Sequence, residues 1–190
     1  MKVTMLISFP ARVGIAVLAK PVMQVIFNQP ETLDLSSRLL AVTSLSIIFY
    51  GMSTLTQAVL QSIGKMITPI VHAAIALAVH AAAMAVMLLY LDNEYRMYYY
   101  VAATVLYSVI VSILNAYSLR KYLRYRQEKD KTFLRPAFAS LVMGAVAYGV
   151  YYGVYLLVPI NLVALGIAVV LAMLVYFVLI IVIRAVTEEE

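Results

Sequence analysis

The sequence predicts an all-α polytopic membrane protein, a bundle of six transmembrane helices with both termini in the cytoplasm. The 190 residues are 65% hydrophobic and only 12% charged, whereas a soluble domain is roughly half apolar and about a quarter charged. The apolar residues gather into runs of about 20 residues, which is the length that crosses a bilayer core as a helix. These runs do not alternate polar and apolar residues as barrel strands would, so helices are expected.

Six spans follow one another along the chain, and most of the connections between them are short. We expect them at residues 5–27, 39–62, 67–91, 97–119, 134–158 and 162–183. The predicted organisation has four helices in residues 1–119, a basic cytoplasmic loop in 120–133, and two final helices with an acidic tail in 134–190.

Lysine and arginine are concentrated on one side of this predicted bundle. The termini, the Gly64–Lys65 turn and the loop that ends at Arg135 share that side and hold ten of the basic residues. The opposite side holds only Arg38 and Arg96. Because basic residues favour cytoplasmic loops, the first side is predicted to be cytoplasmic. The basic loop is interpreted as a solvated cytoplasmic loop that sets the topology, and binding to anionic lipid headgroups is the alternative. The lipid bilayer is the expected partner of the protein as a whole, and no nucleic acid is expected.

A polar stripe runs along the second expected span, although that span is apolar enough to lie in lipid. Its residues are spaced by four, three, four and four positions, so a helix places them on one face. A helix in lipid turns such a face towards protein, water or a ligand. We therefore interpret the stripe as the lining of a cavity or as a packing surface, and its members are Ser46, Tyr50, Ser53, Gln57 and Gln61.

Two basic residues and two histidines lie within the first and third spans. Arg12 is a candidate to line a cavity that receives an anionic headgroup; the alternative for Arg12, and for Lys20, is anchoring at the membrane interface. His80 is a candidate for a polar lining or a proton relay, the alternative being a packed histidine bonded across helices. His72 and His80 have no acidic residue in their span, so no metal site is expected.

Series of small residues predict where helices approach closely in lipid. One series lies in the third span, and another, which contains a GxxxG motif, lies in the fifth. The tyrosines at the ends of the fourth span are interpreted as interfacial belts. The two small-residue series are Ala74, Ala78 and Ala82, and Ala145, Gly149 and Gly153.

The sequence lacks the residue patterns on which enzymes depend. It has no cysteine and no acidic residue inside any expected span. It also has no phosphate-binding glycine loop, G-x-S-x-G elbow or H-E-x-x-H pair. We therefore expect neither an enzyme nor a cofactor.

Four stretches, in order, resemble the polysaccharide-biosynthesis and stage V sporulation protein B branch of the multidrug/oligosaccharidyl-lipid/polysaccharide exporter superfamily. They are FPARVGIAVLAKPVMQVIFN, LTQAVLQSIGKMITP, AATVLYSVIVSILN and RPAFASLVMG. The chain departs from the family pattern at Val101, ahead of Ala102–Ala103–Thr104, and at His80, where relatives often carry lysine.

The resemblance implies a flippase that moves a lipid-linked saccharide across the bacterial inner membrane by alternating access. Family members look like chains of about fourteen helices in two lobes, and this sequence resembles only the last six. The resemblance therefore implies that this sequence is a C-terminal portion of a longer protein, the product of a split gene, or a truncated gene prediction. Its partner would then be an N-terminal lobe or a second chain. The alternatives are a six-helix homodimeric small-molecule transporter and a non-transporting membrane scaffold. The cavity candidates are Arg12, Tyr50, Ser53, Gln57, Gln61 and His80.

Overall fold

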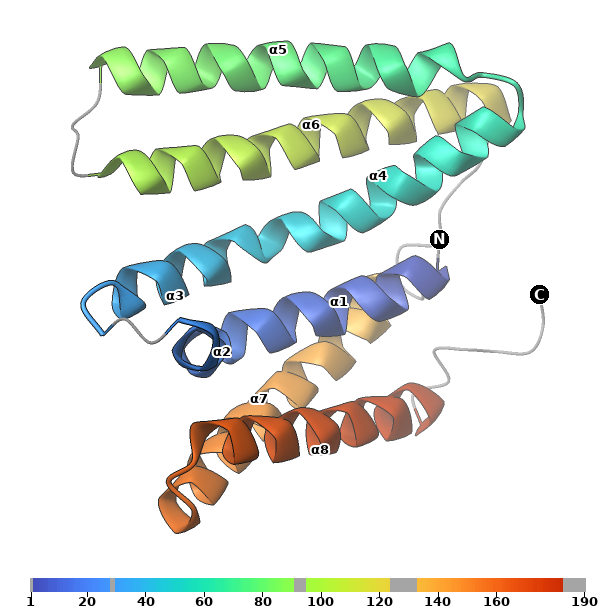
Figure 1. The fold of residues 1–190 in the computed structure, drawn as a ribbon. Helices are drawn as coiled ribbons and strands as arrows, with labels where there is room; N and C mark the ends of the chain where they lie inside the picture. Colours follow the sequence, from blue (N-terminus) through green and yellow to red (C-terminus); the bar gives the residue numbers. More distant parts are fainter. Residues whose placement is uncertain (1, 28–29, 91–94, 124–132, 183–190) are drawn as a thin grey trace. The chain divides into compact units, whose positions relative to one another are not determined.

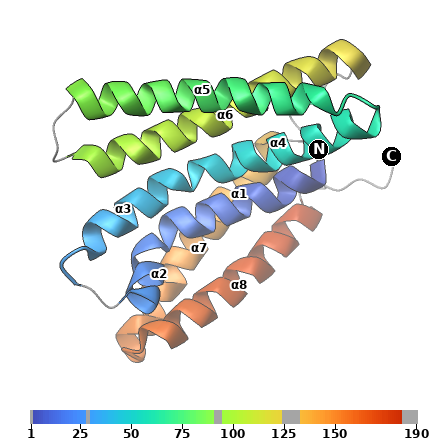
Figure 2. The same cartoon turned by 45° about the horizontal axis from the view of Figure 1, so that its top comes forward.

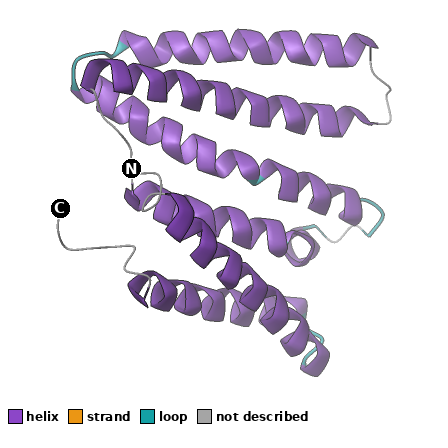
Figure 3. Ribbon diagram, turned by 180° about the vertical axis from the view of Figure 1, so that it is seen from behind, coloured by secondary structure: helices purple, strands orange, loops and turns teal. Residues whose placement is uncertain are grey.

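The computed structural model describes residues 2–27, 30–90, 95–123 and 133–182, and these ranges contain helices and no strand (Figure 3). Five helices are long and apolar enough to cross a membrane, counting Leu33–Ser62 as one, and a bent pair of helices raises the number to six. The predicted all-α bundle of six spans is therefore confirmed. The helices are α1 (Lys2–Val17), α2 (Ala19–Ile26), α3 (Leu33–Thr43), α4 (Leu45–Ser62), α5 (Ile67–Tyr90), α6 (Arg96–Leu123), α7 (Arg135–Leu157) and α8 (Asn161–Val182) (Figure 1).

The first span is bent by 74° between α1 and α2, which the sequence reading did not anticipate. The helix runs through Pro10 without a break but ends at Val17. Pro21 explains the break, because proline has no amide hydrogen to donate to the carbonyl of residue 17. The hydrogen bonds resume on either side, from Leu18 to the Gly14 carbonyl and from Val22 to the Leu18 carbonyl.

The chain divides into two compact units, one of residues 45–127 and the other of residues 2–44 with 128–190. In the first unit, α4, α5 and α6 lie side by side in both views (Figures 1 and 2). Gly64 makes the turn that ends α4, with a φ of 77°. The Lys65 amide donates to the Leu60 carbonyl at 2.9 Å, which closes the last turn of the helix.

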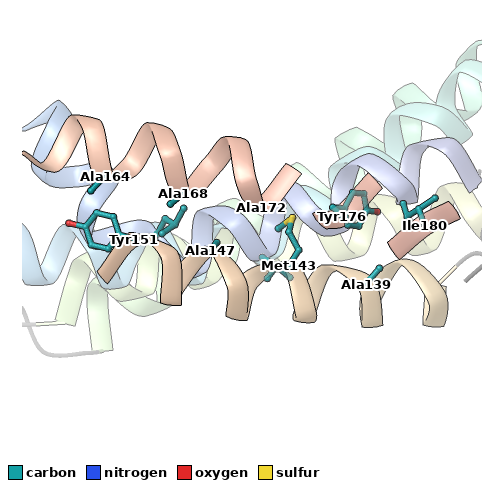
Figure 4. Close-up of a cluster of buried hydrophobic side chains, with 11 residues drawn as sticks. Ala139, Met143, Ala147, Tyr151, Ala164, Ala168, Ala172, Tyr176 and Ile180 are labelled. Carbon is teal, nitrogen blue, oxygen red and sulfur yellow. The ribbon is translucent and has the colours of Figure 1, made fainter. Parts of the chain in front are cut away.

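In the second unit, α7 and α8 pack through residues spaced by four along both helices (Figure 4). Small alanine side chains let the two backbones approach closely, and Tyr151 and Tyr176 fill the space towards the ends. The contributing residues are Ala139, Met143, Ala147 and Tyr151 of α7, and Ala164, Ala168, Ala172, Tyr176 and Ile180 of α8.

Neither of the two small-residue series predicted to pack faces a neighbouring helix within its own unit. Ala74, Ala78 and Ala82 are exposed on α5. On α7, Gly149 and Gly153 have open space around them. The α7 residues that pack on α8 precede the residues of the predicted series by two positions, as Ala147 precedes Gly149. Two positions correspond to a rotation of about 200° around a helix. The predicted series therefore lies on the opposite side of the helix from α8.

Replacing Tyr176 with phenylalanine should destabilise the second unit. The Tyr176 hydroxyl donates to the Leu6 carbonyl at 2.6 Å and so links α8 to α1. An interhelical hydrogen bond in a membrane protein is worth about 0.6–2 kcal/mol. Chemical unfolding in detergent should show a loss of that size, whereas Tyr155→Phe, at a 40% exposed ring, should be close to neutral. Equal effects of the two changes would contradict the assigned role.

Candidate functional site

The polar stripe of α4 divides into a buried edge and an exposed edge. Ser46 and Ser53 are each 5% exposed, and Thr56, which lies next to the stripe on the same side as Ser53, is fully buried. Tyr50 is 40% exposed, and Gln57 and Gln61 are also exposed. Steps of four residues turn the helix by about 40° and the step of three turns it back by about 60°, so Ser46 and Ser53 lie along one edge of the stripe and the exposed residues lie along the other.

The buried edge of the stripe joins α4 to α6. The side-chain amide of Asn115 donates to Ser53 Oγ at 3.2 Å. The Ser112 hydroxyl donates to the Phe49 carbonyl. The structure thus places Ser53, one of the predicted cavity residues, inside the α4–α6 interface of the first unit.

The exposed edge presents neutral polar groups along about three turns of α4. Thr54 lies here too, and its hydroxyl donates to the Tyr50 carbonyl at 2.8 Å. Hydroxyls that bond their own helix backbone are satisfied without a partner helix. The Gln57 and Gln61 side chains provide carboxamides that both donate and accept hydrogen bonds. We call Tyr50, Thr54, Gln57 and Gln61 the α4 polar face.

Tyr50 and His80, predicted from separate helices, contact the same ring. Tyr107 of α6 lies 6.3 Å from Tyr50 and 6.1 Å from His80, measured between ring centroids. His80 Nδ1 lies 3.0 Å from the Ala103 carbonyl oxygen. The sequence reading missed Tyr107. The feature of the sequence that could have identified Tyr107 is its position in the middle of a span, far from the interfacial tyrosines at either end.

A second polar group in the first unit was also missed. His72 Nδ1 lies 2.8 Å from Asn115 Oδ1, and His72 Nε2 lies 3.3 Å from Ser118 Oγ. Asn115 is 1% exposed and Ser118 is 7% exposed. The signal in the sequence was the helical spacing of polar residues along α6, where Ser108, Ser112, Asn115 and Ser118 share one buried side.

In the second unit, the two basic residues of the first span have different surroundings. Lys20 makes a 2.8 Å ion pair with Asp34, and both side chains are largely exposed. Arg12 lies half-buried on α1, and no ion pair or hydrogen bond of its side chain occurs among the described residues. The described residues also contain no cluster of three or more potential metal ligands.

These observations define the class of protein: a multi-pass α-helical membrane protein with an exposed polar face on one spanning helix. The family model described as lipid II flippase MurJ matches residues 1–154. The chain therefore belongs to the MurJ family of lipid II flippases, which are transporters of a cell-wall precursor and not enzymes. This family is a member of the exporter superfamily that the sequence resembled. No curated protein and no solved structure gives a significant match.

Proposed function

We propose that this chain lines part of the path by which a lipid-linked cell-wall precursor crosses the bacterial inner membrane, by alternating access. The observation that carries the proposal is the α4 polar face, exposed on a helix that is long and apolar enough to span a membrane. Together with membership of the flippase family, this face supports a role in substrate passage.

The chemistry of the α4 polar face suits a saccharide headgroup. A polar headgroup crosses the apolar bilayer core only where protein groups replace its hydrogen bonds to water. Glutamine carboxamides offer both donors and acceptors without a charge, so they bind hydroxyl and amide groups without holding the substrate too tightly. We assign Gln57 and Gln61 this role, together with Tyr50 and His80, which both contact Tyr107 in the first unit.

Arg12 is the proposed partner of the pyrophosphate of the substrate. Replacing it with glutamine should lower transport about tenfold or more, because a hydrogen bond to a charged group is worth about 1.5–3 kcal/mol. The matched control is Lys20→Gln, which removes a basic residue that is already paired with Asp34. Flipping rates in vesicles measure both changes, and equal rates for the two variants would refute the assignment.

We further propose that a second lobe completes the cavity over the α4 polar face. In transporters built from two halves, the substrate site lies between the halves near the bilayer midplane. The second lobe is an N-terminal lobe or a second chain, and a second copy of this chain is the alternative. The mass of the purified complex in detergent distinguishes a homodimer from the other arrangements.

The function is tested in membrane vesicles prepared from cells that do or do not carry the gene for this chain. Such vesicles retain any partner lobe. A labelled lipid-linked saccharide added to one leaflet should reach the other leaflet faster when the chain is present. Equal rates in the two vesicle preparations would overturn the proposal.

A further inference from the structure

The side chain of Asn161, at the start of α8, links three helices of the second unit. Its amide nitrogen donates to the Pro21 carbonyl at 3.1 Å and to Gln24 Oε1 at 3.3 Å, both on α2. Its Oδ1 accepts from the Tyr151 hydroxyl of α7 at 2.8 Å. We propose that Asn161 is a latch: its two bonds to α2 hold the first span in its bent form, and their release lets α2 realign with α1.

The neighbours of Asn161 determine which way its carboxamide points. The Pro21 carbonyl oxygen can only accept a hydrogen bond, so the atom that faces it is the amide nitrogen. Both hydrogens of that nitrogen are directed at α2, one at Pro21 and the other at Gln24. The Tyr151 hydroxyl donates to the oxygen on the other side of the group. Tyr151 therefore orients the carboxamide towards α2.

Pro21 permits the bend between α1 and α2 but does not by itself account for its size of 74° (Figure 1). Pro10 lies in the same span, and α1 passes through it without a break. Each proline leaves one carbonyl without its helical donor, that of Leu6 for Pro10 and that of Val17 for Pro21. The Tyr176 hydroxyl of α8 donates to the Leu6 carbonyl at 2.6 Å, which supports the straight course at Pro10. At Pro21, α8 instead bonds to groups beyond the bend.

The straight form of the first span would keep the backbone hydrogen bonds that flank the bend. The Leu18 amide donates to the Gly14 carbonyl at 3.0 Å, and the Val22 amide donates to the Leu18 carbonyl at 2.9 Å. Both are bonds of ordinary helical spacing, so a straight helix contains them too. The bond that Pro21 cannot make is absent from either form. The two forms therefore differ mainly in the contacts of α2 with its neighbours, as expected of a hinge.

The bond from Asn161 is the better protected of the polar contacts that hold α2. Lys20 of α2 forms a 2.8 Å ion pair with Asp34 of α3, but both side chains are largely exposed. Exposed ion pairs contribute little to stability. The bond from Asn161 to the Pro21 carbonyl is partly buried. Loss of the Asn161 bonds should therefore affect the orientation of α2 more than loss of the ion pair.

A change at the bend would reach the α4 polar face through the chain itself. Helix α2 packs against α3 in the second unit, and α3 and α4 together form one helix of residues Leu33–Ser62. Alternating access requires an element with two arrangements, and the bent and straight forms of the first span supply one. Only this link between the latch and transport rests on the proposed function.

The test measures the bend by the distance between spin labels on α1 and α2. The chain has no cysteine, so Ile7→Cys and Ile26→Cys place the labels at two exposed positions. At a rise of 1.5 Å per residue, the helix axes at these positions lie about 23 Å apart for a bend of 74° and about 29 Å apart in a straight helix. In nanodiscs the parent protein should show the shorter distance, and Asn161→Leu should add a component about 5–6 Å longer.

Asn161→Asp is a second variant that keeps the fold if leucine does not. Its carboxylate still accepts from Tyr151 and suits the first turn of α8, but it cannot donate to α2. It should therefore produce the longer distance as leucine does. Tyr151→Phe leaves the carboxamide without its orienting bond and should produce a smaller component at the longer distance.

Asp34→Asn is the matched control, because it removes the exposed ion pair of α2 and leaves the latch in place. It should keep the parent distance. The parent distance in both Asn161 variants, or an equal lengthening in Asp34→Asn, would overturn the proposal.

Asn161→Leu should also lower flipping in vesicles at least about threefold, since the loss of one interhelical hydrogen bond changes the balance of two states by about that factor. Unchanged flipping together with a lengthened distance would overturn the link to transport. If the distance follows Asn161 while the parent protein does not flip, the latch stands and the proposed function fails.

Discussion

Replacing Gln57 and Gln61 together with leucine should strongly lower the rate of flipping and leave membrane insertion intact. Both side chains are exposed on the α4 polar face, so the change removes hydrogen-bonding groups without disturbing the packing of α4 on α6. Each lost hydrogen bond costs about 0.5–1.5 kcal/mol, so the loss of two lowers the rate roughly 5- to 150-fold if both act in the transition state. The rate of lipid-linked saccharide transfer in vesicles and the amount of inserted protein are the two measurements.

The control for this change adds leucine at exposed alanines of the same unit. Ala74→Leu and Ala78→Leu place similar apolar bulk on the open side of α5 and should leave flipping close to that of the parent protein. Wild-type flipping by the glutamine double variant would show that the α4 polar face does not contact the substrate. A loss of insertion would instead assign the two residues a role in assembly.

Gly144→Leu should strongly destabilise the packing of α7 on α1. A Cβ atom at Gly144 would lie 2.5 Å from Val13 Cγ1 and 3.4 Å from Val17 Cγ2. Forcing extra atoms into a packed contact costs about 1–3 kcal/mol. Chemical unfolding in detergent should therefore show a clear loss of the free energy of unfolding.

The same helix offers the matched control, because Gly149 has no atom within 4 Å of an added Cβ. Gly149→Leu changes the helix propensity of α7 by the same amount but creates no clash, so it should be neutral or slightly stabilising. Adding Val13→Ala to Gly144→Leu should restore part of the lost stability. Equal stabilities of the Gly144 and Gly149 variants would contradict the close approach of α1 and α7.

Hydropathy predicted the spans well, because the length of an apolar run and the thickness of a bilayer are directly related. The expected span 67–91 corresponds to α5 (Ile67–Tyr90), and the expected span 162–183 corresponds to α8 (Asn161–Val182). The helix that includes α4 begins at Leu33, earlier than its expected span. Hydropathy placed the start of the span too late because the first turns of this helix are polar. The bend before Pro21 was missed, since a proline inside a span breaks some helices and not others, as Pro10 shows.

Packing partners were harder to predict than spans. Three helices carry small residues at a four-residue spacing, and the sequence does not show which series faces a neighbour. The structure uses Ala164, Ala168 and Ala172, while the series of α5 is exposed. The same reason explains why His72 and Asn115 were not paired, since they are 43 residues apart in the chain and only the arrangement of α5 and α6 brings them together.

The account depends most on the α4 polar face lining a cavity that holds water and substrate. In this cysteine-free chain, single replacements Gln57→Cys and Gln61→Cys place one thiol each on that face, and Leu171→Cys places one on the exposed apolar side of α8. The rate of reaction with a hydrophilic maleimide, with and without lipid-linked saccharide, is the direct measurement. We predict that both α4 thiols react, that the saccharide protects them, and that the α8 thiol stays unreactive. Unreactive α4 thiols, or thiols that the saccharide does not protect, would contradict the account.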